Sequence, residues 1–395
     1  MEPIITSMLD TDLYLLTMQN AICRCYPRAL AKYQFVDRGK AGFHPNMAVE
    51  LKKQINHLSK LQLIGQEKEF LKSVCYYLPP TYIDFLSGYR FNPDEVGINQ
   101  DGGELSIDIV GPFYRTILWE VPLMAIISEL GFMLNGIKPT LDVESIASEK
   151  ATKLSKMGIK WADFGTRRRF SKVVHENVVR QMKTFAPNNF FGTSCVSLAE
   201  KFNLTPIGTM AHAYISFHAA KYGYRMANEM AMNSWLEVFN GDLGVCLPDS
   251  FTTDVFLQSF TTKYAKLFDG CRQDSGVPIE IADKIISHYK KLRIPPETKT
   301  IVFSDNLNSY QKIQDIVDWH KNLPETDRPK ISFGIGTWLS NHTGAKPYNM
   351  VIKLVGAKPN GLDWVSTCKL SDDKGKHTGP QEAIDLCKRV LNINA

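Results

Sequence analysis

From residue 159 onward, short apolar runs alternate with longer amphipathic segments. The segment 171–185 is one of the longer ones, and its Val174, Val178 and Met182 share one helical face. Such alternation is typical of repeated strand–helix units around a parallel sheet. The sequence predicts strands at residues 159–164, 188–192, 204–210, 243–248, 267–273, 300–305 and 330–335.

The ends of these strands share a chemical character. Nearly every one runs into a polar, glycine-rich or acidic stretch, namely DFGTRRR, GTS, GTMAH, PDS, RQDSG, FSDN and GIGT. In an α/β barrel all strand C-termini meet at one rim, whereas a doubly wound sheet gathers ligands only around its switch point. The pattern therefore favours an irregular, TIM-like α/β barrel of about seven strands.

The segment before the barrel is a mixed α/β unit by the same criteria. A helix is expected to begin near Thr11 or Asp12 and to stop before Pro27, a strand follows at 30–36, and a hairpin surrounds residues 101–103. Strands at 348–357 and 362–372 and a helix at 380–391 are expected to complete this unit or close the barrel edge. We predict an N-terminal domain at 1–115, a barrel at 116–345 and a returning C-terminal segment at 346–395.

The length and net charge of the chain indicate which binding partners to expect, a nucleic acid or small anions. The 395 residues are 44% hydrophobic, enough for a large core and two or three structural units. The net charge of +5 is mild, and the longest block of like charge is Arg167 to Arg169. A nucleic-acid-binding surface is therefore not expected, and local sites for small anions fit better.

The compartment follows from the cysteines and the apolar segments. The eight cysteines are scattered without CxxC pairs, which predicts reduced thiols in a cytoplasm. The acidic N-terminus has no basic stretch leading into an apolar core, so no secretory signal is expected. The apolar segment 121–134 is interrupted by Glu129 and is too short to span a bilayer, so a buried helix and no membrane partner are predicted.

The last predicted strand ends in GIGT, residues 334–337, where backbone amides of a late barrel loop can approach a phosphate. A plain glycine turn would look the same. Asp274 and Asp305 end the two preceding strands and can accept hydrogen bonds from sugar hydroxyls, although a single such Asp is often only a helix N-cap. Together the three features favour a ribose phosphate.

His212 follows another strand end, where its imidazole can act as a base, a phosphate donor or a covalent phosphate acceptor. Phe164 and Tyr14 can stack on a flat ring, and Arg272 can cover a ring or pair with a carboxylate, although core roles fit the aromatic residues as well. The DFG triplet is a coincidental match to protein kinases, because GxGxxG, VAIK and HRD motifs are absent.

An ordered series of short motifs carries a resemblance over nearly the whole chain. It comprises LDTDLY, DFGTRRRFS, FGTS, PIGTMAH, DSF, RQDSG, VFSDN, SFGIGT and NMVIK. In this order the motifs resemble the nicotinate phosphoribosyltransferase family. The resemblance implies an enzyme of cytoplasmic NAD salvage. Its irregular α/β barrel would make nicotinate mononucleotide from nicotinate and phosphoribosyl pyrophosphate, coupled to ATP hydrolysis.

The resemblance also implies a place for the pyridine ring. Phe164 and Tyr14 would stack on it, with Tyr14 and Asp12 arriving from the second subunit of a head-to-tail homodimer. Arg272 would lie near the ring and Ser194 near its carboxylate. Relatives that use nicotinamide carry Asp at the place of Ser194, whose charge would repel a carboxylate, so Ser194 indicates nicotinate.

The remaining implied roles concern phosphates and ATP. By resemblance, Asp274 and Asp305 would hold the ribose, Gly336 and Thr337 the 5′-phosphate, and Arg38, Arg167 and Lys353 the pyrophosphate or the phosphates of ATP. ATP would phosphorylate His212, and Mg²⁺ would accompany the pyrophosphate, with no metal ligands assigned. Many bacterial relatives have Glu after this histidine, whereas Ala213 stands here, so the sequence shows no carboxylate that orients the imidazole.

Three alternatives remain at this stage. The same chemistry on nicotinamide is disfavoured by Ser194, and a quinolinate enzyme would need neither His212 nor ATP. A non-catalytic phosphate- or RNA-binding barrel would use the block Arg167–Arg169 but would not need the retained acidic and glycine motifs. Whether Arg168 and Arg169 face the site or are structural is left open.

Overall fold

The computed structural model describes residues 1–373 and 376–393. Its twelve strands are β1 (Leu30–Asp37), β2 (Val96–Asp101), β3 (Glu104–Pro112), β4 (Trp161–Asp163), β5 (Phe190–Thr193), β6 (Thr205–Pro206), β7 (Val245–Cys246), β8 (Gly270–Gln273), β9 (Thr300–Phe303), β10 (Lys330–Ile335), β11 (Met350–Lys358) and β12 (Val365–Ser366).

The helices occupy most of the remaining chain. The α-helices are α1 (Leu13–Cys25), α2 (Met47–Leu58), α3 (Gly65–Val74), α4 (Pro80–Gly88), α5 (Phe113–Thr116), α6 (Glu120–Leu134), α7 (Val143–Lys156), α8 (Lys172–Phe185), α9 (Val196–Phe202), α10 (His212–Tyr222), α11 (Ala227–Phe239), α12 (Thr253–Ser259), α13 (Thr262–Leu267), α14 (Pro278–Lys291), α15 (Tyr310–Asn322), α16 (Thr337–Ser340) and α17 (Gln381–Leu391). Short 3-10 turns are η1 (Pro93–Glu95), η2 (Ile117–Trp119), η3 (Thr166–Arg168), η4 (Pro248–Ser250), η5 (Pro296–Thr298) and η6 (Glu325–Asp327).

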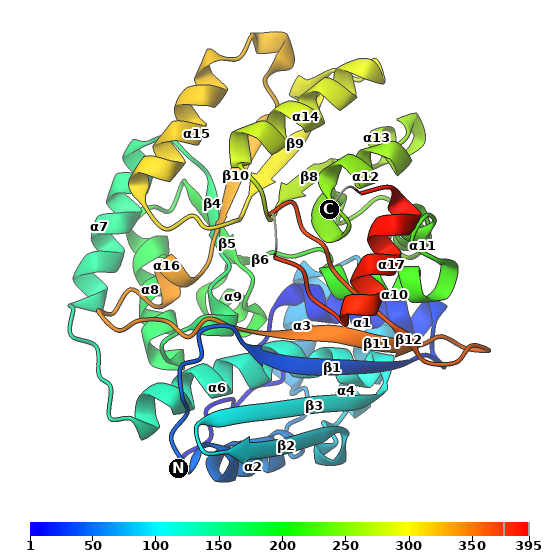
Figure 1. The fold of residues 1–395 in the computed structure, drawn as a ribbon. Coiled ribbons are helices and arrows are strands. Elements are labelled where there is room, and N and C mark those ends of the chain that lie inside the picture. Colours follow the sequence, from blue (N-terminus) through cyan, green and yellow to red (C-terminus); the bar gives the residue numbers. More distant parts are fainter. Residues whose placement is uncertain (374–375, 394–395) are drawn as a thin grey trace. The chain divides into compact units, whose positions relative to one another are not determined.

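The strands form two sheets (Figure 1). The larger sheet has seven strands in the order β6-β5-β4-β10-β9-β8-β7, and the pairs β4–β5, β5–β6, β7–β8, β8–β9 and β9–β10 are parallel. The predicted seven-stranded α/β class is therefore confirmed, in the form of a half-barrel with β6 and β7 as its edges.

The second sheet has five strands in the order β12-β11-β1-β3-β2. The predicted hairpin is present, since β2 and β3 are antiparallel from Val96–Ile109 to Asp101–Glu104. The C-terminal strand β11 lies between N-terminal β1 and the edge strand β12, which confirms that the tail completes the N-terminal sheet.

By internal contacts the chain divides into two compact units, each assembled from separate segments. Unit 1 comprises residues 1–20, 32–208 and 335–353, and unit 2 comprises residues 21–31, 209–334 and 354–395.

The core of unit 1 contains the apolar helix α6. Twelve of its fifteen residues are buried, and the helical stretch Phe113–Leu134 is 83% buried in its most apolar window. Its length and composition would allow a membrane span, so the expectation that the segment is too short was wrong, whereas the predicted burial of the helix is confirmed. Beside it, α8 is capped by the Ser171 hydroxyl, which accepts from the Val174 amide, and buries Val174, Val178 and Met182 on one face.

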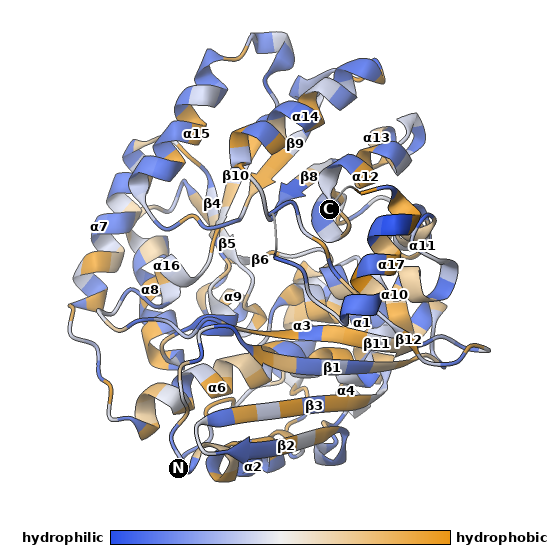
Figure 2. Cartoon of the chain, viewed as in Figure 1, coloured by the Kyte–Doolittle hydropathy of each residue, from blue (hydrophilic) through white to orange (hydrophobic). Residues whose placement is uncertain are grey.

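In unit 2 the strands carry amphipathic helices. Helix α14 buries Ile281, Ile285 and Tyr289 and exposes charged residues, and Figure 2 shows its mixed hydrophobic and hydrophilic colouring. In unit 1, one strand is shorter than predicted: residues 204–210 contribute only β6, Thr205–Pro206. Proline has no amide hydrogen to donate to a strand neighbour, which limits pairing at this point.

Candidate active site

The predicted site residues fall into two groups, one in each unit, and each group is described by itself. Unit 2 contains His212, Asp274, Asp305 and Arg272. Unit 1 contains Asp12, Tyr14, Arg38, Phe164, Arg167, Ser194, Gly336, Thr337 and Lys353.

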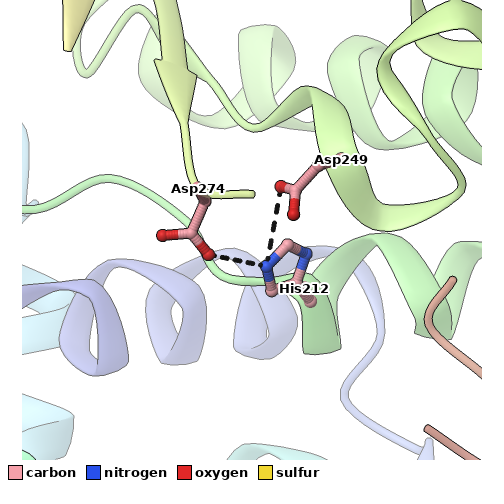
Figure 3. Close-up of side chains that lie close together, drawn as sticks. All are labelled: His212, Asp249 and Asp274. Atoms are coloured by element: carbon pink, nitrogen blue, oxygen red, sulfur yellow. Dashed lines mark hydrogen bonds and ion pairs between the residues drawn. The ribbon is translucent and has the colours of Figure 1, made fainter. Parts of the chain in front are cut away.

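His212 is the first residue of α10, and both of its ring nitrogens have partners. Nε2 lies 3.0 Å from Asp274 Oδ2 and 3.7 Å from Asp249 Oδ1 (Figure 3). Nδ1 lies 2.9 Å from the Ser250 hydroxyl, in the turn after β7. The strand ends after β7 and β8 thus fix the imidazole orientation.

Lys369 adds a cation to the same cluster. Its Nζ lies 2.8 Å from His212 Nε2 and 2.9 Å from Asp249 Oδ2. Burial and the Lys369 charge lower the pKa of His212 to about 4, against the opposing effect of Asp249 and Asp274. His212 is therefore a neutral imidazole near pH 7, which is the form that can act as a nucleophile.

Asp274 is held as a carboxylate. Burial works to raise its pKa, but Arg272, which pairs with Oδ1, and His212 lower it well below the usual value. Arg272 also lies 3.2 Å from the Ser304 hydroxyl, directly after β9. The predicted Arg272, Asp274 and His212 are thus brought into direct contact.

Asp305 directly follows Ser304, and its pKa is shifted in the opposite direction from that of Asp274. Burial, and then the charges of Asp274 and Asp373, raise the pKa of Asp305 to about 6. A ligand that brings positive charge or hydroxyl donors would relieve this repulsion. The strand ends after β7, β8 and β9 therefore present carboxylates as a group, as the sequence predicted for Asp274 and Asp305.

In unit 1, the ends of β4 and β5 lie close to Ile335, the last residue of β10. The Phe164 amide donates to the Ile335 carbonyl at 2.9 Å, and a Cβ on Gly336 would lie 3.1 Å from the Phe164 carbonyl oxygen. The Ser194 amide donates to the Asp163 carbonyl at 2.7 Å. Phe164, Ser194 and the GIGT loop are therefore neighbours, with Thr337 beginning α16.

Asp12 meets Ser194 within one chain. The Ser194 hydroxyl donates to Asp12 Oδ1 at 2.7 Å, and Asp12 also forms a β-bridge with Cys195. Asp12 is 2% exposed, and burial raises its pKa. A second subunit is thus not required to bring Asp12 beside Ser194. Tyr14 lies in the first turn of α1, two residues further on.

The three consecutive arginines have three different environments. Arg169 is 1% exposed and binds Asp10 through both terminal nitrogens, at 2.6 and 3.0 Å. Arg168 donates to the Met350 carbonyl at 3.0 Å. Arg167 is 41% exposed and lies 3.4 Å from Glu120.

The pKa of Arg168 reflects two cationic neighbours. Burial, and then the charges of Arg167 and Arg38, lower its pKa to about 10. Arg38 itself is held by its backbone amide on the Asn349 carbonyl at 2.8 Å. Arg38, Arg167 and Arg168 therefore form a concentration of positive charge of the kind that binds a polyanion.

Sequence reasoning missed several residues of these clusters. Asp249 and Ser250 lie in the PDS stretch, whose position after a predicted strand was a usable signal. Lys369 is 157 residues from His212 along the chain, and nothing local indicates their contact. Asp163 and His175 form a further contact, 12 residues apart along the chain, that no local pattern indicates.

Comparison with known proteins identifies the family to which the chain is related. A model of the nicotinate phosphoribosyltransferase (NAPRTase) family matches residues 159–395, and a model of its N-terminal domain matches residues 9–128. Nicotinate phosphoribosyltransferase of Desulforapulum autotrophicum is 49% identical over 390 residues, covering 98% of this chain and 99% of the relative. The enzyme of Chromohalobacter salexigens is 43% identical, with 98% of each chain covered.

Solved structures agree in fold. The crystal structure of nicotinate phosphoribosyltransferase from Porphyromonas gingivalis has a TM-score of 0.95 at 42% identity, covering 99% of this chain and 100% of that one. The structure from Vibrio cholerae has a TM-score of 0.90 at 30% identity, covering 100% and 95%. This chain belongs to the nicotinate phosphoribosyltransferase family.

Proposed function

We propose that this protein transfers the phosphoribosyl group of phosphoribosyl pyrophosphate to nicotinate in NAD salvage, and that ATP drives the transfer through phosphorylation of His212. The observation that carries the proposal is the His212 cluster, in which a buried neutral imidazole touches Asp274, Ser250 and Lys369. Full-length relatedness to nicotinate phosphoribosyltransferases supports the choice of substrate.

The phosphorylation step follows from the contacts of the ring. In the tautomer in which Nδ1–H donates to the Ser250 hydroxyl, Nε2 accepts from Lys369 Nζ and its lone pair is the nucleophile. In this tautomer the ring donates no hydrogen to Asp274, whose carboxylate acts through its charge. Nε2 attacks the γ-phosphorus of ATP, the bond to the bridging oxygen breaks, and ADP leaves with that oxygen. Lys369 Nζ, 2.8 Å from Nε2, lies where it can neutralise the incoming phosphoryl oxygens.

In the transfer step the protein acts by positioning and charge stabilisation. The bond between ribose C1 and pyrophosphate lengthens, C1 takes on oxocarbenium character, and the pyridine nitrogen of nicotinate forms the new bond. We assign Asp274 and Asp305 to the ribose hydroxyls, Gly336 and Thr337 to the 5′-phosphate, and Phe164, Tyr14 and Arg272 to the ring. The pyrophosphate or the ATP phosphates are assigned to Arg38, Arg167 and Lys353, with Arg168 added because of its place in the arginine group.

Magnesium fits the acidic strand ends. The carboxylates of Asp249 and Asp274 and the Nε2 atom of His212 lie within 4.8 Å of one another, and Asp249 Oδ1 has no hydrogen-bond partner among the residues described. Mg²⁺ prefers oxygen ligands, so Asp249 and Asp274 are the residues that would hold it. Bound there, it would supply positive charge to phosphate oxygens.

The preference for nicotinate is assigned to Ser194, with a contribution from Asp12. A serine hydroxyl has one hydrogen, which here points to Asp12. If Asp12 takes up a proton, it can donate to the Ser194 oxygen and release the hydroxyl hydrogen to a ring carboxylate. The raised pKa of Asp12 favours this protonated form.

The test is mononucleotide formation from phosphoribosyl pyrophosphate and Mg²⁺ with nicotinate or nicotinamide, each with and without ATP. Nicotinate turnover accelerated by ATP is expected, and nicotinamide as the better substrate would refute the assignment. His212→Ala should abolish the ATP effect and retain slow transfer. Ser194→Asp should shift relative kcat/KM toward nicotinamide, and an unchanged ratio would contradict the role of Ser194.

Further elements of the proposal concern assembly and compartment. We propose a homodimer in the cytoplasm in which Tyr14 reaches the ring site of the second subunit. Mixing an inactive Tyr14→Ala chain with an inactive Ser194→Trp chain tests this, because shared sites would restore activity in hybrid dimers and unshared sites would not. Salt-sensitive RNA retention without turnover would instead support a binding barrel.

A further inference from the structure

A buried carboxylate lies directly behind the ends of β4 and β5. Asp163 is the last residue of β4 and is 0% exposed. Its Oδ1 accepts from the Gly165 amide at 2.9 Å, and its Oδ2 accepts from the Thr193 hydroxyl at 2.6 Å. His175 Nε2 lies 2.7 Å from the same Oδ2.

His175 contributes its polar group to this carboxylate alone. It lies on α8, is 0% exposed, and its Nδ1 has no hydrogen-bond partner among the residues that the structure describes. Because a carboxylate only accepts, Nε2 must carry the hydrogen of this bond. His175 is therefore a buried hydrogen-bond donor to Asp163.

Two chain segments are attached to this one carboxylate. Through Gly165 it holds the turn between Phe164 and Arg167, and a Cβ on Gly165 would lie 2.4 Å from the Ser340 hydroxyl and 2.8 Å from Asp163 Oδ1. Through Thr193, whose hydroxyl also accepts from the Cys195 amide at 3.2 Å, it holds the end of β5 next to Ser194.

We propose that Asp163 and His175 are a positioning pair that sets the spacing between Phe164 and Ser194. The inference rests on the proposed function, because Phe164 and Ser194 are there assigned to the face and the carboxylate of the nicotinate ring. Phe164 is the first residue after β4, so the hydrogen bonds that hold Asp163 and Gly165 fix the backbone on both sides of it.

A purely structural role would make a different prediction. If the pair only stabilised the fold, its loss would lower the melting temperature and leave the kinetic constants of the folded enzyme unchanged. If the pair sets the ring contacts, the constants themselves change, because displacements of about 1 Å at a reacting group can cost about 10²-fold in rate.

The experiment compares three full-length variants at a temperature where circular dichroism shows each of them folded. His175→Phe keeps the ring volume and removes the donor, and His175→Gln restores an N–H donor. Val178→Ala removes buried volume on the same face of α8 and leaves the hydrogen bonds to Asp163 in place. Steady-state KM for nicotinate, KM for phosphoribosyl pyrophosphate and kcat are measured for each.

We expect His175→Phe to raise KM for nicotinate by about tenfold or more and to lower kcat, and His175→Gln to recover most of this loss even if its melting temperature stays low. Val178→Ala should lower the melting temperature with constants within about twofold of the wild-type values. Wild-type constants in folded His175→Phe, or an equal kinetic loss in Val178→Ala, would overturn the proposal.

A second pair of variants covers the case in which His175→Phe does not fold. Thr193→Val removes one donor to Oδ2 and keeps the side-chain shape, while Thr193→Ser keeps the hydroxyl. A rise in KM for nicotinate in Thr193→Val but not in Thr193→Ser supports the positioning role, and equal constants in both refute it. Wild-type protein that does not use nicotinate at all would instead mean that the proposed function has failed.

Discussion

The buried pair of Arg169 and Asp10 allows a quantitative prediction. Both side chains are 1% exposed, and they form two parallel hydrogen bonds of 2.6 and 3.0 Å. Replacing Arg169 by Met leaves the Asp10 carboxylate buried, with Lys172 at 3.6 Å as its remaining ion-pair partner among the described residues. Removing one partner of a buried ion pair costs about 3–5 kcal/mol, a large share of the roughly 5–15 kcal/mol of a typical domain.

The free energy of unfolding can be measured by urea denaturation at pH 7, followed by circular dichroism. Arg169→Met should lose about 3–5 kcal/mol, while the double variant Asp10→Leu with Arg169→Met should recover most of the loss, because no unpaired charge remains. Arg167→Met is the matched control: its partner Glu120 is 3.4 Å away and Arg167 is 41% exposed, so its effect should stay below about 1 kcal/mol.

The loss of unfolding free energy in Arg169→Met should also depend on pH. In the wild-type fold, burial works to raise the pKa of Asp10, but Arg169 lowers it on balance, so this stabilisation is present above the unfolded value of 3.8 and is lost as the pH falls through the folded value. In Arg169→Met the carboxyl group prefers to be protonated, so the difference between variant and wild type should shrink from pH 7 to pH 4. A loss below about 1 kcal/mol at pH 7, or a double variant whose loss equals the sum of the singles, would refute this reasoning.

Three further predictions concern titratable groups and the imidazole. Lys369→Met should raise the pKa of His212 above its value of about 4, because the nearest cation is removed; an unchanged NMR titration of the ring would contradict this. Ser250→Ala should lower the ATP-driven acceleration of nicotinate turnover at least about tenfold while ATP-independent transfer persists, and equal acceleration would contradict the role of this hydroxyl. Burial lowers the pKa of Lys150 to about 7, so the unfolded chain binds more protons between pH 7 and about 10, and stability should gain from rising pH in that window. Lys150→Met should remove this gain, as melting temperatures at pH 7 and pH 9 would show.

The fold was predictable because its signals are local. Short apolar runs with polar ends locate the strands of the seven-stranded sheet, and the repeated order of strand and helix selects a parallel arrangement. The extents of the edge strands were not predictable. Strands β6 and β12 have two residues each, where sequence suggested about seven and eleven, because pairing at an edge depends on the neighbour that the fold supplies.

The site was predictable where chemistry follows a strand end directly. Asp274 and His212 are in contact, as their places after two strands suggested. Contacts between distant segments have no local sequence pattern that predicts them. Arg169 contacts Asp10, and Lys369 contacts His212, only after the fold brings these segments together. Three adjacent arginines look equivalent in the sequence, yet they have different surroundings around a short 3-10 turn. Arg167 is at the surface, Arg168 donates to a backbone carbonyl and Arg169 pairs with a buried carboxylate.

The contacts of the His212 ring show whether its orientation requires a glutamate where Ala213 stands. A glutamate at that position would be one way to orient an imidazole, but here Ser250 holds Nδ1, and Asp274 and Lys369 face Nε2. Asp249 in turn holds Lys369 at 2.9 Å, and burial of the ring limits its rotation. A ring held at both nitrogens does not need a carboxylate on the adjacent residue. The proposed ATP coupling would therefore depend on residues from η4, from the segment after β8 and from the C-terminal tail, and Ala213 is compatible with it.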